Sequence, residues 1–400
     1  MAHASHHAPV PAAEKFDGRR LGNLPNICLG IGGGGIALSL LGYFICEPGQ
    51  FGYSWLFAFI YFFTLAMGCF FWTCLHHATD SEWSVVVRRV WENTASLLPY
   101  FALLFIPLFF APEQIWRWWN LAPKDHPHLH AKVGYLNHGF FIVRYVSYFA
   151  LLGIWTWVLR SRSIKQDKDG LSKHTHVMRK FGVSGIPVMA LCLTFGAFDW
   201  LMGIDYKWFS TMWGVYVFAG AAGASMSLTV IIVTLLRERG YLKPVNLEHY
   251  HIMGKFMLAF TIFWAYIGFS QYMLIWYANI PEETIYFRIR NTESWHFFSL
   301  LLVIGRFFIP FPILLTQWIK KEPQRLCLVA GWILLMQLLD MYVIVLPGLH
   351  PLGFSPSILD ITSFCGVGGI VAYLWFRLLP SAFLFPTRDP RLAASLNITN

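Results

Sequence analysis

The sequence predicts an all-α polytopic membrane protein with about ten transmembrane helices. Hydrophobic residues make up 56% of the 400-residue chain and charged residues only 13%, whereas a soluble chain carries about 25% charged residues to keep its surface wetted. The hydrophobic residues also fall into about ten runs of the roughly 20 residues that a helix needs to cross a bilayer. These observations exclude a disordered protein, a coiled coil and a soluble cytoplasmic enzyme.

The apolar runs give the expected spans in chain order. The first follows about 20 polar residues and is too long for the core of a cleavable signal peptide. The third is the shortest, because Pro99 and Pro107 interrupt it. The others are nearly continuous and carry few charges, as the bilayer core requires. The expected spans cover residues 25–46, 53–76, 95–111, 136–160, 184–204, 210–236, 252–276, 293–318, 325–346 and 356–378.

Small residues gather in the first, sixth and tenth spans, at Gly32–Gly35, Gly220–Gly223 and Gly366–Gly369. Small side chains let two helices approach closely in a membrane. A dinucleotide-binding loop at Gly30–Gly35 is rejected, because no strand precedes it and it lies within a span. These glycines therefore predict close helix packing.

The loop charges orient the bundle. One side carries about 21 Lys and Arg and the other about six, so the first side is expected to be cytoplasmic by the positive-inside rule. The net charge of +9 thus indicates topology rather than nucleic-acid binding. The cytoplasmic side holds a polar tail (1–24), loops near 77–95, 160–183, 237–251 and 319–325, and a C-terminal tail (379–400); the transmembrane domain is 25–378. On the other side, Trp116, Trp118 and Trp119 in the 112–135 loop suit the headgroup level.

The Cys and His residues give no metal or haem pattern. The seven Cys contain no CxxC pair and no CxxCH motif, and most lie in apolar runs, which indicates buried thiols. His76 and His77 would point about 100° apart on a helix and are poorly placed to share one ion. The His126–His130 stretch has alternating His but no acidic or Cys partner, which favours a solvated loop. No metal and no bound redox cofactor are therefore expected in this chain.

Ionisable residues inside the spans are the functional candidates, because each costs several kcal/mol unless it is paired or hydrated. At about 1.5 Å per residue, Arg144 of the fourth span and Asp199 of the fifth lie at one level, which predicts a structural ion pair. Arg306 and Asp340 repeat this arrangement on the eighth and ninth spans. The recurrence predicts two parallel four-helix bundles, about 53–204 and 210–346, plus two further helices.

Titratable groups are expected at inner, middle and outer levels, which is the arrangement that a transmembrane proton route needs. Structural pairing is the alternative for each residue. No catalytic residue is expected. The candidate route comprises His76, Asp80, Glu82, Glu248, His251 and Lys255 on the inside, Tyr266 and Arg306 in the middle, and Asp199, Asp205, Gln271, His296 and Asp340 on the outside.

A quinone pocket would need hydrogen-bond partners for two carbonyl groups within an aromatic slot. His138, Asp199 and Tyr272 are the candidates for such a pocket.

Three stretches resemble a known family: Ala197–Asp205 (AFDWLMGID) with Trp208–Met212 (WFSTM), Phe263–Thr284 (FWAYIGFSQYMLIWYANIPEET) and Val329–Leu334 (VAGWIL). They are similar to the NrfD-like, or polysulfide-reductase-like, membrane subunits of bacterial alternative complex III, and to the smaller of the two. The ten-span layout and the length fit this family along the whole chain.

The resemblance implies a role in quinol oxidation. Such a complex lies in the bacterial inner membrane and oxidises quinol on the outer side, and its electrons pass to cytochrome c or to a terminal oxidase. The iron–sulfur clusters and c-type haems belong to partner subunits: an iron–sulfur/molybdopterin-like protein and multihaem cytochromes c. The larger NrfD-like subunit is the better candidate for the quinol site. The smaller is associated with proton conduction and assembly, holds no redox centre, and leaves open whether it binds quinone.

Two other classes remain as alternatives. A secondary transporter would have inverted repeats and helices broken near the midplane, whereas the repeat expected here is parallel. A purely structural anchor subunit would use its buried charges only for pairing.

Overall fold

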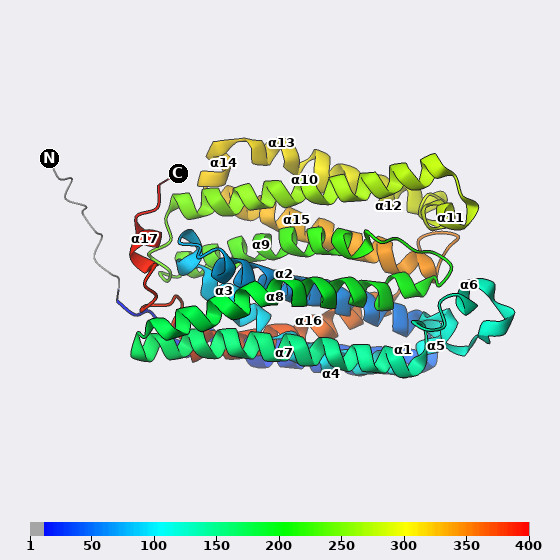
Figure 1. The fold of residues 1–400 in the computed structure, drawn as a ribbon, viewed down its shortest axis with the longest axis horizontal. Coiled ribbons are helices and arrows are strands. Elements are labelled where there is room, and N and C mark those ends of the chain that lie inside the picture. The colour runs from blue at the N-terminus through cyan, green and yellow to red at the C-terminus, as the bar shows by residue number, and fades with distance from the viewer. Residues whose placement is uncertain (1–11, 400) are drawn as a thin grey trace.

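The computed structural model describes residues 12–399, and within them the chain is helical with no β-strand. Ten helices are long and apolar enough to cross a membrane, which confirms the expected fold class. They lie along the long axis of the molecule, side by side (Figure 1). The ten spans are Leu24–Ile45, Gln50–Ala78, Arg88–Phe109, His138–Asp169, Ser172–Ile204, Trp213–Glu238, Leu247–Ala278, Glu293–Leu315, Pro323–Gly348 and Ile358–Ser381.

Several spans are single helices: α1 (Leu24–Ile45), α2 (Gln50–Ala78), α7 (His138–Asp169), α8 (Ser172–Trp200), α9 (Trp213–Glu238), α10 (Leu247–Ala278), α15 (Pro323–Val345) and α16 (Ile358–Leu378). The third span consists of α3 (Arg88–Ala95) and α4 (Phe101–Phe105) with short 3₁₀ turns. The eighth consists of α12 (Glu293–Val303), a π-helical turn (Ile304–Phe308) and α13 (Pro310–Leu315). Short helices α5 (Pro112–Ile115), α6 (Pro127–His130), α11 (Pro281–Arg290), α14 (Gln317–Lys321) and α17 (Leu392–Leu396) lie in the connections and the C-terminal tail.

Helix α2 forms the centre of the molecule. Its residues are buried around almost the whole helix, as expected for a helix that is apolar on every side. It packs against α8, α9, α16 and α3. The indole nitrogen of Trp72 donates to the carbonyl of Ala222 on α9 at 3.0 Å, and the ring of Phe63 packs edge-on against Trp200 of α8. Contacts from α2 thus reach helices of both halves of the chain.

The glycines of the first and tenth spans allow α1 and α16 to pack backbone to backbone. A Cβ atom on Gly35 would lie 2.6 Å from the carbonyl oxygen of Thr362, and one on Gly369 would lie 2.5 Å from the nitrogen of Gly32. The hydroxyl of Ser39 lies 2.9 Å from that of Thr362 and adds a polar contact between the helices. Only a residue without a side chain fits these crossing points.

One expected loop is a helical hairpin. Residues 160–183 were expected to be a charged loop, but α7 continues to Asp169 and α8 begins at Ser172. Gly170, with φ of 68°, ends α7 in the left-handed conformation that favours glycine. The physical reason is that Lys, Arg and Gln end a membrane span but are good helix formers in water.

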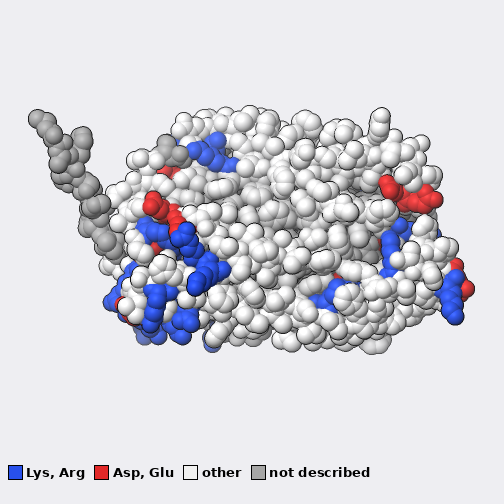
Figure 2. Space-filling view, viewed as in Figure 1, with Lys and Arg blue, Asp and Glu red and all other residues white. Residues whose placement is uncertain are grey.

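On the face shown in Figure 2, Lys and Arg side chains gather at the end where α17 and the α7–α8 hairpin lie in Figure 1, and the middle of that face is almost free of charge. We call this end the inner end. The N-terminal and C-terminal segments meet there, since the amide of Leu384 donates to the carbonyl of Glu14 at 2.8 Å. The 1–24 tail expected from the sequence is described from residue 12 onward, and its first 11 residues lie outside the described part.

We expect a Gly35→Ala substitution to destabilise the protein, because the new Cβ would press on α16. Overpacking of this kind costs about 1–3 kcal/mol. Gly34→Ala is the matched control, because a Cβ on Gly34 has nothing within 4 Å. Thermal unfolding in detergent measures both variants, and equal midpoints for the two would contradict the close helix crossing.

Candidate functional site

The polar residues buried in the described part of the chain include three groups with ionic contacts. The first ion pair joins α7 to α8, the second ion pair joins the π turn to α15, and the inner cluster lies at the inner end. The first ion pair is Arg144–Asp199 and the second is Arg306–Asp340. The inner cluster consists of Arg88, Arg89, Glu92, Asp167, Asp389 and Arg391.

The first ion pair is bidentate. Arg144 donates from Nε to Oδ2 of Asp199 at 2.9 Å and from Nη2 to Oδ1 at 2.8 Å. The Tyr148 hydroxyl donates to Oδ2 at 2.8 Å. The remaining nitrogen, Nη1, donates to the carbonyl of Tyr135 at 2.9 Å. Two parallel hydrogen bonds fix the mutual orientation of the groups, so this pair holds α7 and α8 in register, at the level expected from the sequence.

The second ion pair is monodentate. Arg306 donates from Nη1 to Oδ2 of Asp340 at 2.5 Å, and its Nη2 donates to the side-chain carbonyl of Gln337. The other carboxylate oxygen, Oδ1, accepts a hydrogen bond from the Tyr216 hydroxyl at 2.6 Å. The indole of Trp264 donates to Oδ2 at 3.1 Å and lies under the guanidinium, 4.5 Å from ring centroid to Cζ. Residues of α9, α10 and α15 therefore surround one arginine of the π turn.

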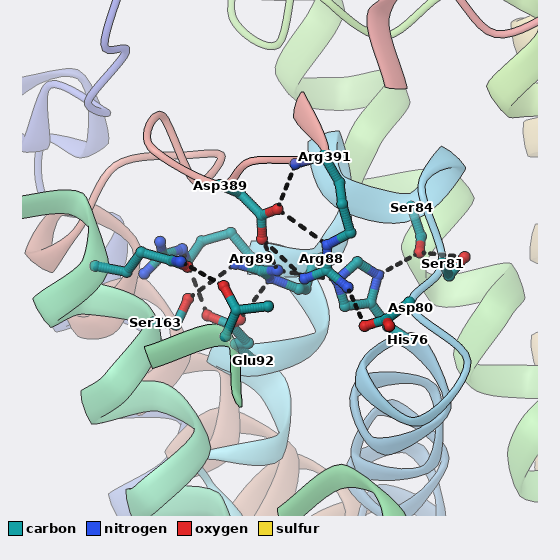
Figure 3. A network of polar contacts seen from close by, with 12 residues as sticks. His76, Asp80, Ser81, Ser84, Arg88, Arg89, Glu92, Ser163, Asp389 and Arg391 are labelled. Atoms are coloured by element: carbon teal, nitrogen blue, oxygen red, sulfur yellow. Dashed lines mark hydrogen bonds and ion pairs between the residues drawn. The ribbon is translucent and has the colours of Figure 1, made fainter. Parts of the chain in front are cut away.

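The inner cluster ties α3 to α7 and to the C-terminal tail (Figure 3). Arg88 contacts Glu92 at 2.9 Å and Asp389 at 2.6 Å. Arg89 contacts Asp167 of α7 at 2.7 Å. Burial opposes ionisation of Asp389, but the charges of Arg88 and Arg391 outweigh it and hold the pKa of that carboxyl well below its usual range. Asp389 is therefore a permanent anion at neutral pH.

His76 has a fixed tautomer within this network. Its Nε2 lies 2.9 Å from Nη1 of Arg88, and its Nδ1 lies 2.6 Å from the hydroxyl of Ser84. An arginine can only donate, so Nε2 of His76 accepts the hydrogen bond from Arg88. The ring proton is therefore on Nδ1, which donates to the hydroxyl of Ser84. The imidazole is then neutral. His77 is buried, and neither of its ring nitrogens has a hydrogen-bond partner among the described residues.

The other inner residues of the expected route lie in two separate places. Asp80 contacts Arg179 at 2.8 Å and Arg391 at 3.4 Å, at the edge of the inner cluster. Glu248, at the start of α10, contacts Lys321 at 2.5 Å and His251 at 3.4 Å. Glu82 and Lys255 are exposed.

Two expected route residues lie on the outside of the helices. Tyr266 was expected in the middle of the route with Arg306 and bridging water, but the residue is 64% exposed. Two residues along a helix correspond to about 200° of rotation, so Tyr266 faces away from the side of Trp264. His296 is also exposed. The tyrosine at the second ion pair is Tyr216, which sequence reasoning missed because it precedes a run of small residues and carries no charge.

The three residues proposed for a quinone pocket are not brought together. His138 lies on the surface, where its Nε2 is 2.7 Å from the carbonyl of Trp119. Both oxygens of Asp199 are occupied by Arg144. Tyr272 is on α10, on the opposite long side of the molecule from α7 (Figure 1), and packs against Phe287. These three side chains therefore do not form one site, and the predicted quinone pocket is not present in this form.

Polar groups continue from the second ion pair toward the outer end. Gln271 is buried and accepts a hydrogen bond from the Ser210 hydroxyl at 2.6 Å. Asp205 lines an outer cavity of about 540 Å³ together with Trp208, Tyr286 and Arg290. Burial lowers the pKa of Arg290 from its usual value. A second hollow of about 530 Å³, lined by apolar residues such as Met189 and Phe260, lies between α8 and α10.

The described residues contain no group of three or more His, Cys, Asp or Glu placed to hold a metal ion. A scan against protein-family models and a search of curated proteins find no match for this chain.

We expect an Asp389→Asn substitution to lower stability by about 3 kcal/mol at neutral pH, because it leaves buried Arg88 with one carboxylate partner fewer. The folded-state pKa of Asp389 is depressed, so its contribution is complete above the ordinary aspartate pKa of about 4. It is lost as the pH falls through the lower, folded-state pKa. Unfolding midpoints of both proteins across this pH range measure the effect. A difference that grows as the pH falls would contradict the ion pair.

Proposed function

We propose that this chain is an integral membrane subunit of a quinol-oxidising respiratory complex of the alternative complex III class, and that it contributes a transmembrane proton route. The second ion pair supports the proton route most directly. It places an aspartate that is 1% exposed beside a hydroxyl donor and an arginine within a span. Buried charged groups in a bilayer are costly, and in membrane proteins they commonly lie on proton and ion pathways.

The route follows the second half of the chain. Protons are collected at Glu248 and His251, at the inner start of α10. They reach Asp340 through bridging water, with Arg306 and Tyr216 around the carboxylate. Ser210 and Gln271 lie on the outward side, and Asp205 lines the outer cavity. Water is needed at each gap, because protons hop only between groups in hydrogen-bond contact.

The proposed partners follow from the resemblance. Electrons travel through iron–sulfur clusters and c-type haems on the other subunits to cytochrome c or to a terminal oxidase, while this chain holds no redox centre. The larger NrfD-like subunit carries the quinol site in this proposal. The membrane is the bacterial inner membrane, and the inner end, with its Lys and Arg side chains, faces the cytoplasm.

A secondary transporter is the second candidate, because the eighth span is interrupted by the π turn that contains Arg306. Broken helices at the midplane are typical of transporter binding sites. Uptake of a substrate by the purified chain in vesicles would favour this candidate. Co-purification with iron–sulfur and multihaem subunits would favour the respiratory complex.

We expect an Asp340→Asn substitution to lower proton release per electron in reconstituted vesicles of the complex, because an amide cannot carry the proton. Tyr216→Phe removes only the hydroxyl that contacts Asp340 and should lower the ratio less, with full assembly. Arg144→Lys is the comparison at the first ion pair and should affect stability rather than the ratio. An unchanged ratio in Asp340→Asn, in complexes that assemble and turn over, would rule out a route through Asp340.

A further inference from the structure

The π turn in the eighth span has a local chemical cause. The amide of Ile309 bonds to the carbonyl of Ile304 at 3.0 Å, five residues back rather than four. The next residue, Pro310, has no N–H to donate. The carbonyl of Gly305 therefore loses the donors that a regular α-helix or a longer π-helix would supply. An unpaired carbonyl at this depth in a bilayer would be costly.

Trp332 of α15 supplies the missing donor. Its indole nitrogen donates to the carbonyl of Gly305 at 2.6 Å. The two segments are tightly packed there, since a Cβ on Gly305 would clash with the sulfur of Met336 and lie 3.5 Å from the Trp332 ring. The turn is thus held from a neighbouring helix rather than by its own hydrogen bonds alone.

The π turn determines where Arg306 points. A π turn is an α-helical turn with one residue inserted, and one residue corresponds to about 100° of rotation. If the π turn formed at another place along the span, so that its extra residue lay on the other side of position 306, the arginine would turn away from Asp340. Arg144, in contrast, lies on α7, which continues without such a turn from His138 to Asp169.

The surroundings of Arg306 offer contacts in addition to Asp340. Nη2 is already bonded to Gln337, and the guanidinium lies over the Trp264 ring. Gly220 of α9 leaves the space for this arrangement, since a Cβ there would lie 2.9 Å from both Nη2 and the Gln337 oxygen. Arg306 could therefore leave Asp340 and keep an amide oxygen and an aromatic face as partners.

We propose that Trp332 is a positioning residue, because its indole N–H holds the π turn that aims Arg306 at Asp340. The second ion pair, which lies on this turn, can open and form again, while the first ion pair stays closed. When the pair is open, Asp340 takes a proton from the inner side, and it gives the proton up to the outer side when Arg306 returns. The arginine keeps its own charge throughout. This inference rests on the proposed proton route.

The test compares two Trp→Phe substitutions in the intact complex, reconstituted in vesicles. Trp332→Phe removes the donor to the Gly305 carbonyl and keeps most of the ring volume. Trp55→Phe is the matched control, because the Trp55 indole also donates to a backbone carbonyl, that of Leu104, at 2.8 Å. Both variants lose one hydrogen bond from an indole to a backbone carbonyl, but only Trp332 contacts the π turn.

Two quantities are measured: protons released per electron, and the infrared difference band of a protonated carboxylic acid during turnover, assigned through its absence in Asp340→Asn. We expect Trp332→Phe to lower the proton ratio at least twofold and to shift or weaken the band, with electron transfer retained. Trp55→Phe should leave both at the wild-type values.

The other outcomes separate a failure of the Trp332 role from a failure of the proton route. Wild-type values for both quantities in Trp332→Phe would overturn the positioning role. An equal loss in both variants would also overturn it, because the effect would then be one of packing. If Asp340→Asn itself leaves the proton ratio unchanged, the proton route fails. If Asp340→Asn lowers the ratio and Trp332→Phe does not, only the role of Trp332 fails.

Discussion

Neutralisation of buried arginines is the constraint on which the arrangement of the helices depends. A guanidinium in a low-dielectric interior is expensive unless a carboxylate lies against it. The four most buried arginines, Arg88, Arg89, Arg144 and Arg306, each contact at least one carboxylate. The carboxylates that pair with these arginines from a different element lie on α7, α8, α15 and the C-terminal tail. Each such contact fixes the relative position of two elements that hydrophobic packing alone would allow to slide.

The two pairs within the membrane spans use this constraint differently. Arg144 occupies both oxygens of Asp199 and lies on an uninterrupted helix. Arg306 occupies one oxygen of Asp340, donates from Nη2 to Gln337, and lies on a π turn. The first geometry resists any change of partner. Asp199 and Arg144 also keep a hydroxyl donor, Tyr148, and a second acceptor, the Tyr135 carbonyl. The second pair differs in its single guanidinium–carboxylate hydrogen bond and in its place on a π turn, which are the conditions for a pair that separates and reforms.

The inner cluster makes the C-terminal tail part of the folded structure. Asp389 joins Arg88 of α3, and the amide of Thr387 donates to Asp167 of α7 at 3.2 Å. Farther along the tail, Ser395 lies 3.4 Å from Nε2 of His249 on α10. The tail therefore crosses the inner ends of helices from both halves of the chain. Asp389 is buried together with its partner Arg88, and the tail is fixed over the inner end of the bundle.

The sequence by itself determined the fold class and the number of spans, because apolar runs of sufficient length have one stable solution in a bilayer. It also indicated the level at which Arg144 and Asp199 meet, since depth along a helix follows from residue number. Glycine positions predicted the close crossing of α1 and α16 for a similar reason: a missing side chain is visible in the sequence.

Rotation of helices and distant pairing were decided only by the tertiary structure. Tyr266 and Tyr216 are both aromatic residues in apolar runs, and only packing shows that the second one faces Asp340. The charged stretch at 160–183 was expected to be a loop, because the sequence marks where a bilayer ends and not where a helix ends. The partnership of Trp332 with Gly305 depends on a donor lost at Pro310 and supplied from α15, and no local pattern connects residues on two different helices in this way.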